Sequence, residues 1–156
     1  MSVRDGMLDI IGRVRELIGD ESEEQFTKAV RAVKKSGACI VRGGAFKPRT
    51  SPFSFQGLEK AGLELLARAR EKFNIPVVTE VVDPHDVSLV SKYANILQVG
   101  SRNMQNFALL TEIGKSKCPV LLKRGFWCTV AEWLTAADYL LAGGTFSPSP
   151  RRTSPG

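Results

Sequence analysis

The sequence lacks an apolar run that approaches the roughly 20 residues needed to cross a bilayer. Its first ten residues, MSVRDGMLDI, place Arg4 and Asp5 where a secretory signal would need apolar side chains. We therefore expect no membrane partner and a cytoplasmic location. The GxGxxG and GxxxxGK[ST] motifs are also missing, which argues against the common nucleotide-binding fingerprints.

Histidine and paired cysteines are scarce as well. The single histidine, His85, excludes a two-histidine metal site within the chain, and its DPHD context favours a helix start capped by Asp83. The three cysteines, Cys39, Cys118 and Cys128, form no CxxC motif, so we predict free thiols buried as small apolar residues.

The composition is that of one globular domain. The chain has 156 residues, of which 43% are hydrophobic and 24% are charged, enough for a hydrophobic core. The net charge is +6, and two of these charges, Arg151 and Arg152, belong to the last six residues. The positive balance favours anionic partners such as phosphates, carboxylates or nucleic acid.

Helical and strand-like segments alternate along most of the chain. Apolar side chains recur at helical spacing over 7–18 and 23–35. Apolar, strand-like runs then occur at 38–41, 76–82, 96–99 and 119–122. Each run is followed by a helical pattern, at 58–73, 84–93, 104–113 and 129–141 respectively. Continuous apolar strands separated by helices predict a parallel sheet of right-handed βα units. The fold class is therefore α/β, with about four parallel βα units at a spacing that fits a barrel-type repeat better than a Rossmann fold.

Three regions follow from this pattern. We expect an N-terminal amphipathic helix within residues 1–20, the partial barrel over 21–144, and a disordered tail over 145–156, where TFSPSPRRTSPG is rich in serine and proline. The abrupt change at residue 145 suggests a truncated or frame-altered end.

Basic residues gather where the predicted strands end. One carboxylate, Glu80, accompanies Arg42, Lys47, Arg49, Arg102, Lys123 and Arg124. Ligands bind at the carboxyl ends of parallel strands, so this set predicts a cationic pocket for a phosphorylated and carboxylated substrate. The cations follow the strand ends rather than a single stripe with aromatics, so we do not expect nucleic acid as partner.

Four motifs are distinctive enough to compare with a known family: RGGAFKPRTSPFSFQG (42–57), VVTEV (77–81), QVGSRNMQNF (98–107) and PVLLKRGF (119–126). In this order and spacing they closely resemble the 3-deoxy-D-arabino-heptulosonate 7-phosphate (DAHP) synthases, over about residues 21–144. The subgroup resembled is related to the 3-deoxy-D-manno-octulosonate 8-phosphate synthases. The KPRT at 47–50 favours the heptulosonate enzyme, since the octulosonate relatives typically carry an asparagine in this loop.

The resemblance implies a (β/α)8 (TIM) barrel, of which this chain would form a partial barrel of about four parallel βα units. It also implies a transferase of the shikimate pathway of aromatic amino acid biosynthesis. It condenses phosphoenolpyruvate with erythrose 4-phosphate and releases phosphate. Catalysis would fall to Lys47, which is placed to protonate the aldehyde oxygen, and to Glu80, near the reacting carbons. By the same resemblance, phosphoenolpyruvate would be bound by Arg42, Lys47, Gly100, Ser101, Arg102 and Lys123, and erythrose 4-phosphate by Pro48, Arg49 and Thr50.

The sequence departs from the family pattern at the metal site. Members carry GPCSVES in the first strand, whose cysteine binds the metal; here ELIGDES (16–22) places Ile18 at that position. The other ligands, a histidine, a glutamate and an aspartate, belong to strands beyond Gly144. We therefore expect no metal ligands or cofactor in this chain, although complete members use a divalent metal such as Mn2+.

Three functions remain open on this basis. The first is a DAHP synthase family chain without measurable activity alone, which self-associates or needs a missing C-terminal partner. The second is a non-catalytic phosphate- or phosphoenolpyruvate-binding module, or a fragment of a split enzyme. The third is an octulosonate 8-phosphate synthase, which arabinose 5-phosphate as acceptor would distinguish.

Overall fold

The structure, a computed structural model, describes residues 20–44 and 59–145. The helix expected within 7–18, the segment 45–58 and the tail from residue 146 lie outside the described residues. The described part contains these elements in order: α2 (Asp20–Lys35), β1 (Val41–Gly43), α3 (Glu59–Phe73), β2 (Val77–Glu80), the 3₁₀ turn η1 (Pro84–Asp86), α4 (Val87–Tyr93), β3 (Ile96–Val99), the 3₁₀ turn η2 (Ser101–Asn103), α5 (Phe107–Lys115), β4 (Val120–Leu122), α6 (Val130–Leu140) and the π-helical turn η3 (Leu141–Thr145).

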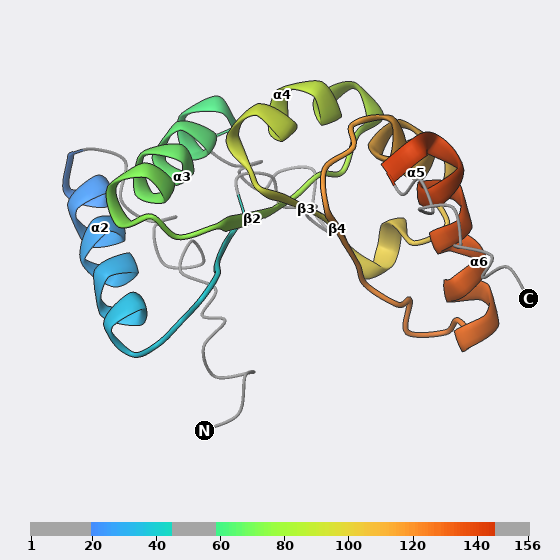
Figure 1. Cartoon of the computed structure of the whole chain (residues 1–156), viewed down its shortest axis with the longest axis horizontal. Helices are drawn as coiled ribbons and strands as arrows, with labels where there is room; N and C mark the ends of the chain where they lie inside the picture. The colour runs from blue at the N-terminus through green and yellow to red at the C-terminus, as the bar shows by residue number, and fades with distance from the viewer. Residues whose placement is uncertain (1–19, 45–58, 146–156) are drawn as a thin grey trace, which may run out of the picture.

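The four strands form one parallel sheet in the order β1-β2-β3-β4. Figure 1 shows the helices in an arc along one face of this sheet, with α2 near β1 at one end and α5 and α6 beyond β4 at the other. A parallel sheet needs a crossover between successive strands, and α3, α4 and α5 supply these crossovers. The expected α/β fold of about four parallel βα units is confirmed.

The hydrophobic core lies between the sheet and the helices. The buried side chains that form it come from helices and strands alike. They include Phe26, Val30, Leu63, Leu66, Leu109, Leu110 and Ile113 on helices, and Val41, Val77, Leu97 and Val99 on strands. Because side chains alternate between the two faces of a strand, this burial assigns one face to the helices. The polar residues between these positions belong to the opposite face.

The first strand begins later than the sequence predicts. Residues 38–40 connect α2 to β1, and pairing starts where the Val41 N–H donates to the Pro76 carbonyl at 2.9 Å. Gly37, at φ +89°, ends α2 in the left-handed region, and Ala38 N–H bonds back to the Val33 carbonyl. The chain is still leaving the helix over the residues expected to be strand.

The burial predicted for the cysteines is wrong in one case and only partly met in the others. Cys39 lies in the connection before β1 and is exposed, while Cys118 and Cys128 are partly buried. All three are free thiols, as the absence of a CxxC motif predicts.

Side-chain caps begin the helices near the strand ends. The Asp83 carboxylate accepts from the His85 backbone N–H at 2.8 Å, with Pro84 in the first position, so the expected role of the DPHD motif is confirmed. Before α6, Thr129 and Glu132 form a reciprocal capping box. These caps set where the loops after β2 and β4 end.

The last two helices are joined by a close backbone contact. A Cβ atom placed on Gly114 of α5 would lie 2.6 Å from the Leu140 carbonyl oxygen and 2.9 Å from the Gly143 Cα. Both obstacles are backbone atoms, so neither side can move away by changing a rotamer. The absence of a side chain at Gly114 allows α5 to pack directly against the end of α6.

We therefore expect Gly114→Ala to lower the free energy of unfolding by about 1–3 kcal/mol, the usual cost of overpacking. The control is Lys115→Ala at the neighbouring exposed site, which removes only an exposed ion pair to Glu112 and should cost less than about 1 kcal/mol. Urea denaturation followed by circular dichroism measures both. Equal stabilities of the two variants would contradict the close contact.

Candidate functional site

Polar side chains from neighbouring strands share the face of the sheet away from the helices. Arg42 is paired in register with Val78, and Glu80, two residues further along β2, is paired with Gln98 of β3. Register partners in a parallel sheet point to the same side. Arg42, Glu80 and Gln98 therefore lie on one face, although Glu80 and Gln98 follow Arg42 by 38 and 56 residues in the sequence.

Glu80 is held on two sides. The Gln98 side-chain amide donates from Nε2 to Glu80 Oε2 at 3.2 Å. A Cβ atom on Gly100 would lie only 2.1 Å from Glu80 Oε1 and 3.1 Å from its Cδ. The carboxyl group thus occupies the space that a side chain at Gly100 would need.

Cations surround this carboxyl group but do not control its ionisation. Burial raises the pKa of Glu80 above its ordinary value, and this effect outweighs the opposing pull of Arg42, Lys123 and Arg102 and of the Gln98 hydrogen bond. These three cations come from β1, from the end of β4 and from η2. Side chains as far apart in the sequence as Arg42 and Lys123 therefore both influence the pKa of Glu80.

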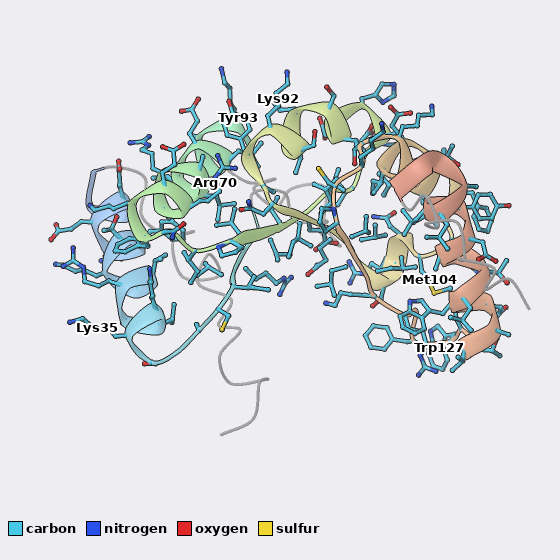
Figure 2. All side chains as sticks on the ribbon, viewed as in Figure 1. Lys35, Arg70, Lys92, Tyr93, Met104 and Trp127 are labelled. Atoms are coloured by element: carbon cyan, nitrogen blue, oxygen red, sulfur yellow. The ribbon has the colours of Figure 1, made fainter. Side chains whose placement is uncertain are left out.

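The loops that follow β3 and β4 are tied to each other. The Gly125 backbone N–H donates to the Met104 sulfur at 3.1 Å in a buried contact, and Met104, labelled in Figure 2, follows directly after η2. At the base of the second loop, the Lys123 N–H donates to the Val99 carbonyl at 3.0 Å. These contacts place the loop that carries Lys123 beside the loop that carries Arg102.

The structure brings most of the predicted site residues to this edge of the sheet. Those that lie there are Arg42, Glu80, Gly100, Ser101, Arg102 and Lys123. Lys47, Pro48, Arg49 and Thr50 fall in the segment 45–58, outside the described residues.

The sequence prediction assigned no role to two residues of the site. Gln98 binds Glu80, and its signal in the sequence is a single polar residue within the apolar run ILQV. Met104 anchors the neighbouring loop through its sulfur, and no pattern in the sequence distinguishes it from a core methionine.

Within residues 20–44 and 59–145, no group of three or more His, Cys, Asp or Glu side chains could hold a metal ion. The described residues therefore do not form a site for the divalent metal that the resemblance implies for complete members. In the same part of the chain, no helix combines the length and apolarity needed to span a bilayer.

The fold and this cluster define a class: a parallel βα sheet with a cationic edge built around one carboxyl group. Arginine and lysine bind carboxylates and phosphates, and a carboxyl group with a raised pKa is suited to accept a proton. The same edge of the sheet carries the ligand sites of (β/α)8 barrels.

Comparison with known proteins assigns the chain to a family within this class. The model of the DAHP synthetase I family matches residues 20–153, and the chain belongs to this family. It is 46% identical over 124 residues to a phospho-2-dehydro-3-deoxyheptonate aldolase of Thermotoga maritima, covering 80% of this chain and 37% of that protein. A 2-dehydro-3-deoxyphosphooctonate aldolase of Arabidopsis thaliana is 30% identical over 131 residues, covering 80% of this chain and 45% of that one.

Solved structures agree with this assignment. The crystal structure of a DAHP synthase from Thermotoga maritima superposes with a TM-score of 0.72 at 43% identity, covering 78% of this chain and 35% of that chain. A truncated form of the enzyme from the same organism gives a TM-score of 0.69 at 41% identity and covers 43% of that chain. This chain thus spans less than half the length of each of these relatives.

The raised pKa of Glu80 has a consequence for stability. The folded state holds the Glu80 proton more tightly than the unfolded chain, so ionisation costs stability as the pH rises above the ordinary value of 4.5. Glu80→Gln keeps an acceptor for Gln98 and removes this cost. We expect the variant to be more stable than the parent at pH 7.5, by less than about 1 kcal/mol because solvent screens a half-buried group.

The difference should disappear below about pH 4, where the carboxyl group is protonated in both states. Urea denaturation at pH 3.5 and pH 7.5 measures it. A variant that is less stable than the parent at pH 7.5 would show that the cations outweigh burial.

Proposed function

We propose that this chain supplies the phosphoenolpyruvate-binding part of a DAHP synthase barrel, whose reaction condenses phosphoenolpyruvate with erythrose 4-phosphate. The observation that carries the proposal is the convergence of Arg42, Arg102 and Lys123 on Glu80 at one edge of the sheet. Phosphoenolpyruvate carries a carboxylate and a phosphate, and three cations from separate strand ends can bind both groups at once. Membership of the DAHP synthase family favours phosphoenolpyruvate over other anions of similar charge.

The residues divide between the two charged groups of phosphoenolpyruvate. Its carboxylate would be bound by Arg42, Lys47 and Lys123. Its phosphate would be bound by Arg102, Lys123 and the backbone of Gly100 and Ser101. Lys123 lies at the end of β4, where its loop is held beside the Arg102 loop, so it can contact both groups.

The reacting carbons would lie above Glu80. Carbon 3 of phosphoenolpyruvate attacks the aldehyde of erythrose 4-phosphate, whose segment of the site is Pro48, Arg49 and Thr50, and Lys47 protonates the aldehyde oxygen. Water then adds at carbon 2, and Glu80 takes up the proton. A proton acceptor with a raised pKa suits this step, because its conjugate acid is not too strong to form.

This chain alone would bind phosphoenolpyruvate without completing the reaction. Among its described residues, no group of three or more His, Cys, Asp or Glu side chains could hold the divalent metal that would supply electrophilic activation of an aldehyde in complete members. Binding without turnover is also the behaviour of a phosphoenolpyruvate-binding module or of one half of a split enzyme. Turnover by the purified chain with added Mn2+ would contradict the proposal.

Titration calorimetry with phosphoenolpyruvate tests the binding. We expect Lys123→Ala to weaken binding at least roughly tenfold, since hydrogen bonds to charged groups contribute about 1.5–3 kcal/mol. The control is Lys92→Ala, on the exposed face of α4 (Figure 2), which removes the same charge far from the sheet edge and should leave the affinity unchanged. A folded parent chain that does not bind phosphoenolpyruvate would refute the function.

A second function, association, is favoured by apolar side chains around the last helix. Trp127, labelled in Figure 2, is 97% exposed and Phe126 is 85% exposed. Val130 and Leu134 of α6 are also more than half exposed. These four residues, the α6 surface, follow β4, and solved relatives with the same fold extend well beyond the part that this chain matches.

We propose that the α6 surface is an association surface and that, in the purified chain, it binds a second copy of this chain. Sedimentation velocity over a range of concentrations measures this association. We expect Leu134→Glu to weaken it at least tenfold, because a charge would be buried in an apolar contact. Thr135→Glu, at the adjacent exposed position of α6, is the control. A parent chain that stays monomeric at every concentration would contradict self-association.

A further inference from the structure

Gln98 carries an unusual combination of burial and incomplete hydrogen bonding. Its side chain is only 1% exposed, within a strand whose neighbours Leu97 and Val99 are core residues. No donor among the described residues lies within hydrogen-bonding distance of its Oε1 atom. A buried acceptor without a donor costs about 1–3 kcal/mol, so its presence calls for an explanation.

The orientation of the Gln98 amide is determined by its partner. An ionised carboxylate only accepts hydrogen bonds, so the donor that faces Glu80 Oε2 at 3.2 Å is the amide nitrogen. The amide oxygen is bonded to the same carbon as this nitrogen. Gln98 Oε1 and the Glu80 carboxylate are therefore two acceptors close together, and neither can satisfy the other.

Three cations lie near the Glu80 carboxyl group. Arg42 on β1, Arg102 on η2 and Lys123 after β4 act on the Glu80 carboxyl group and, under the proposed function, bind the anionic groups of the substrate. Both acceptors need a hydrogen-bond donor, and a neutral molecule can donate to them without adding charge. Water has two O–H groups, one for each acceptor.

We propose that Gln98 is a positioning residue: its Nε2 holds the Glu80 carboxylate, and its Oε1 accepts a hydrogen bond from the water that adds to carbon 2 of phosphoenolpyruvate. This inference rests on the proposed function. In the step itself, a bond forms between the water oxygen and the electron-deficient carbon 2, and one O–H bond breaks. The electron pair of that bond stays on the oxygen, the proton passes to Glu80, and Gln98 exchanges no proton.

Gly100 supports the same arrangement from the other side. A side chain at Gly100 would overlap Glu80 Oε1, so the glycine leaves the carboxyl group room to lie beside Gln98. The carboxylate is thus held between an amide donor and a residue without a side chain. Both restraints come from β3 and its end, so the position of Glu80 depends on the β2–β3 register.

The first measurement is the pKa of Glu80 by carbon-detected NMR in the full chain. Gln98→Leu removes the donor with little change in volume, and we expect it to raise this pKa by at least half a unit. Gln105→Leu, at an exposed glutamine after η2, is the matched control and should leave the pKa of Glu80 unchanged. An unchanged Glu80 pKa in Gln98→Leu would overturn the positioning role.

The second measurement detects the water directly. With 15N-labelled glutamine, we expect a nuclear Overhauser effect between bound water and the Gln98 side-chain amide protons in the parent chain, and its loss in Glu80→Leu. No such effect in the parent, or an unchanged effect after Glu80→Leu, would overturn the water site.

Calorimetry with phosphoenolpyruvate distinguishes a failure of the proposed function from a failure of the proposed role of Gln98. Gln98 contacts neither charged group of the substrate in this scheme, so Gln98→Leu should bind phosphoenolpyruvate within about twofold of the parent. If the parent itself fails to bind phosphoenolpyruvate, the proposed function fails, whereas the pKa and the water signal still decide whether Gln98 positions Glu80. A loss of binding of tenfold or more in Gln98→Leu would make Gln98 a substrate ligand and overturn the positioning role.

Discussion

The parallel register of the four strands is the constraint on which the site depends. Pairing Val78 with Arg42 and Gln98 with Glu80 places polar residues of three strands on the face opposite the core. A shift by one residue would turn these side chains toward the helices and expose the apolar ones. The same packing that buries Leu97 therefore also presents Gln98 beside Glu80.

Electrostatics at the sheet edge reflects a balance between burial and cations. Burial favours the protonated form of Glu80, and the surrounding cations favour the ionised form; burial is the larger effect. An arriving anion would neutralise part of the positive charge and shift the balance further toward protonation. Substrate binding and proton uptake by Glu80 would thereby support each other.

Much of the fold could be predicted because its signals are local. The run Ile96–Val99 is a strand with the bounds that its apolar pattern indicates, and Asp83 and Pro84 start a helical turn as their residue types favour. The start of β1 could not be predicted in this way. Cys39 has an apolar neighbourhood in sequence, but the left-handed residue Gly37 delays pairing until Val41.

The sequence by itself determined the alternation of helices and strands, the family, and the supply of cations at strand ends, because these depend on residue types and their spacing. Only the tertiary structure decided that Glu80 is held between Gln98 and Gly100 and that burial outweighs the charge of Arg42 and Lys123 at its carboxyl group. These properties arise from distances between residues on different strands. Such distances are set by register and packing, which no single segment of the chain contains.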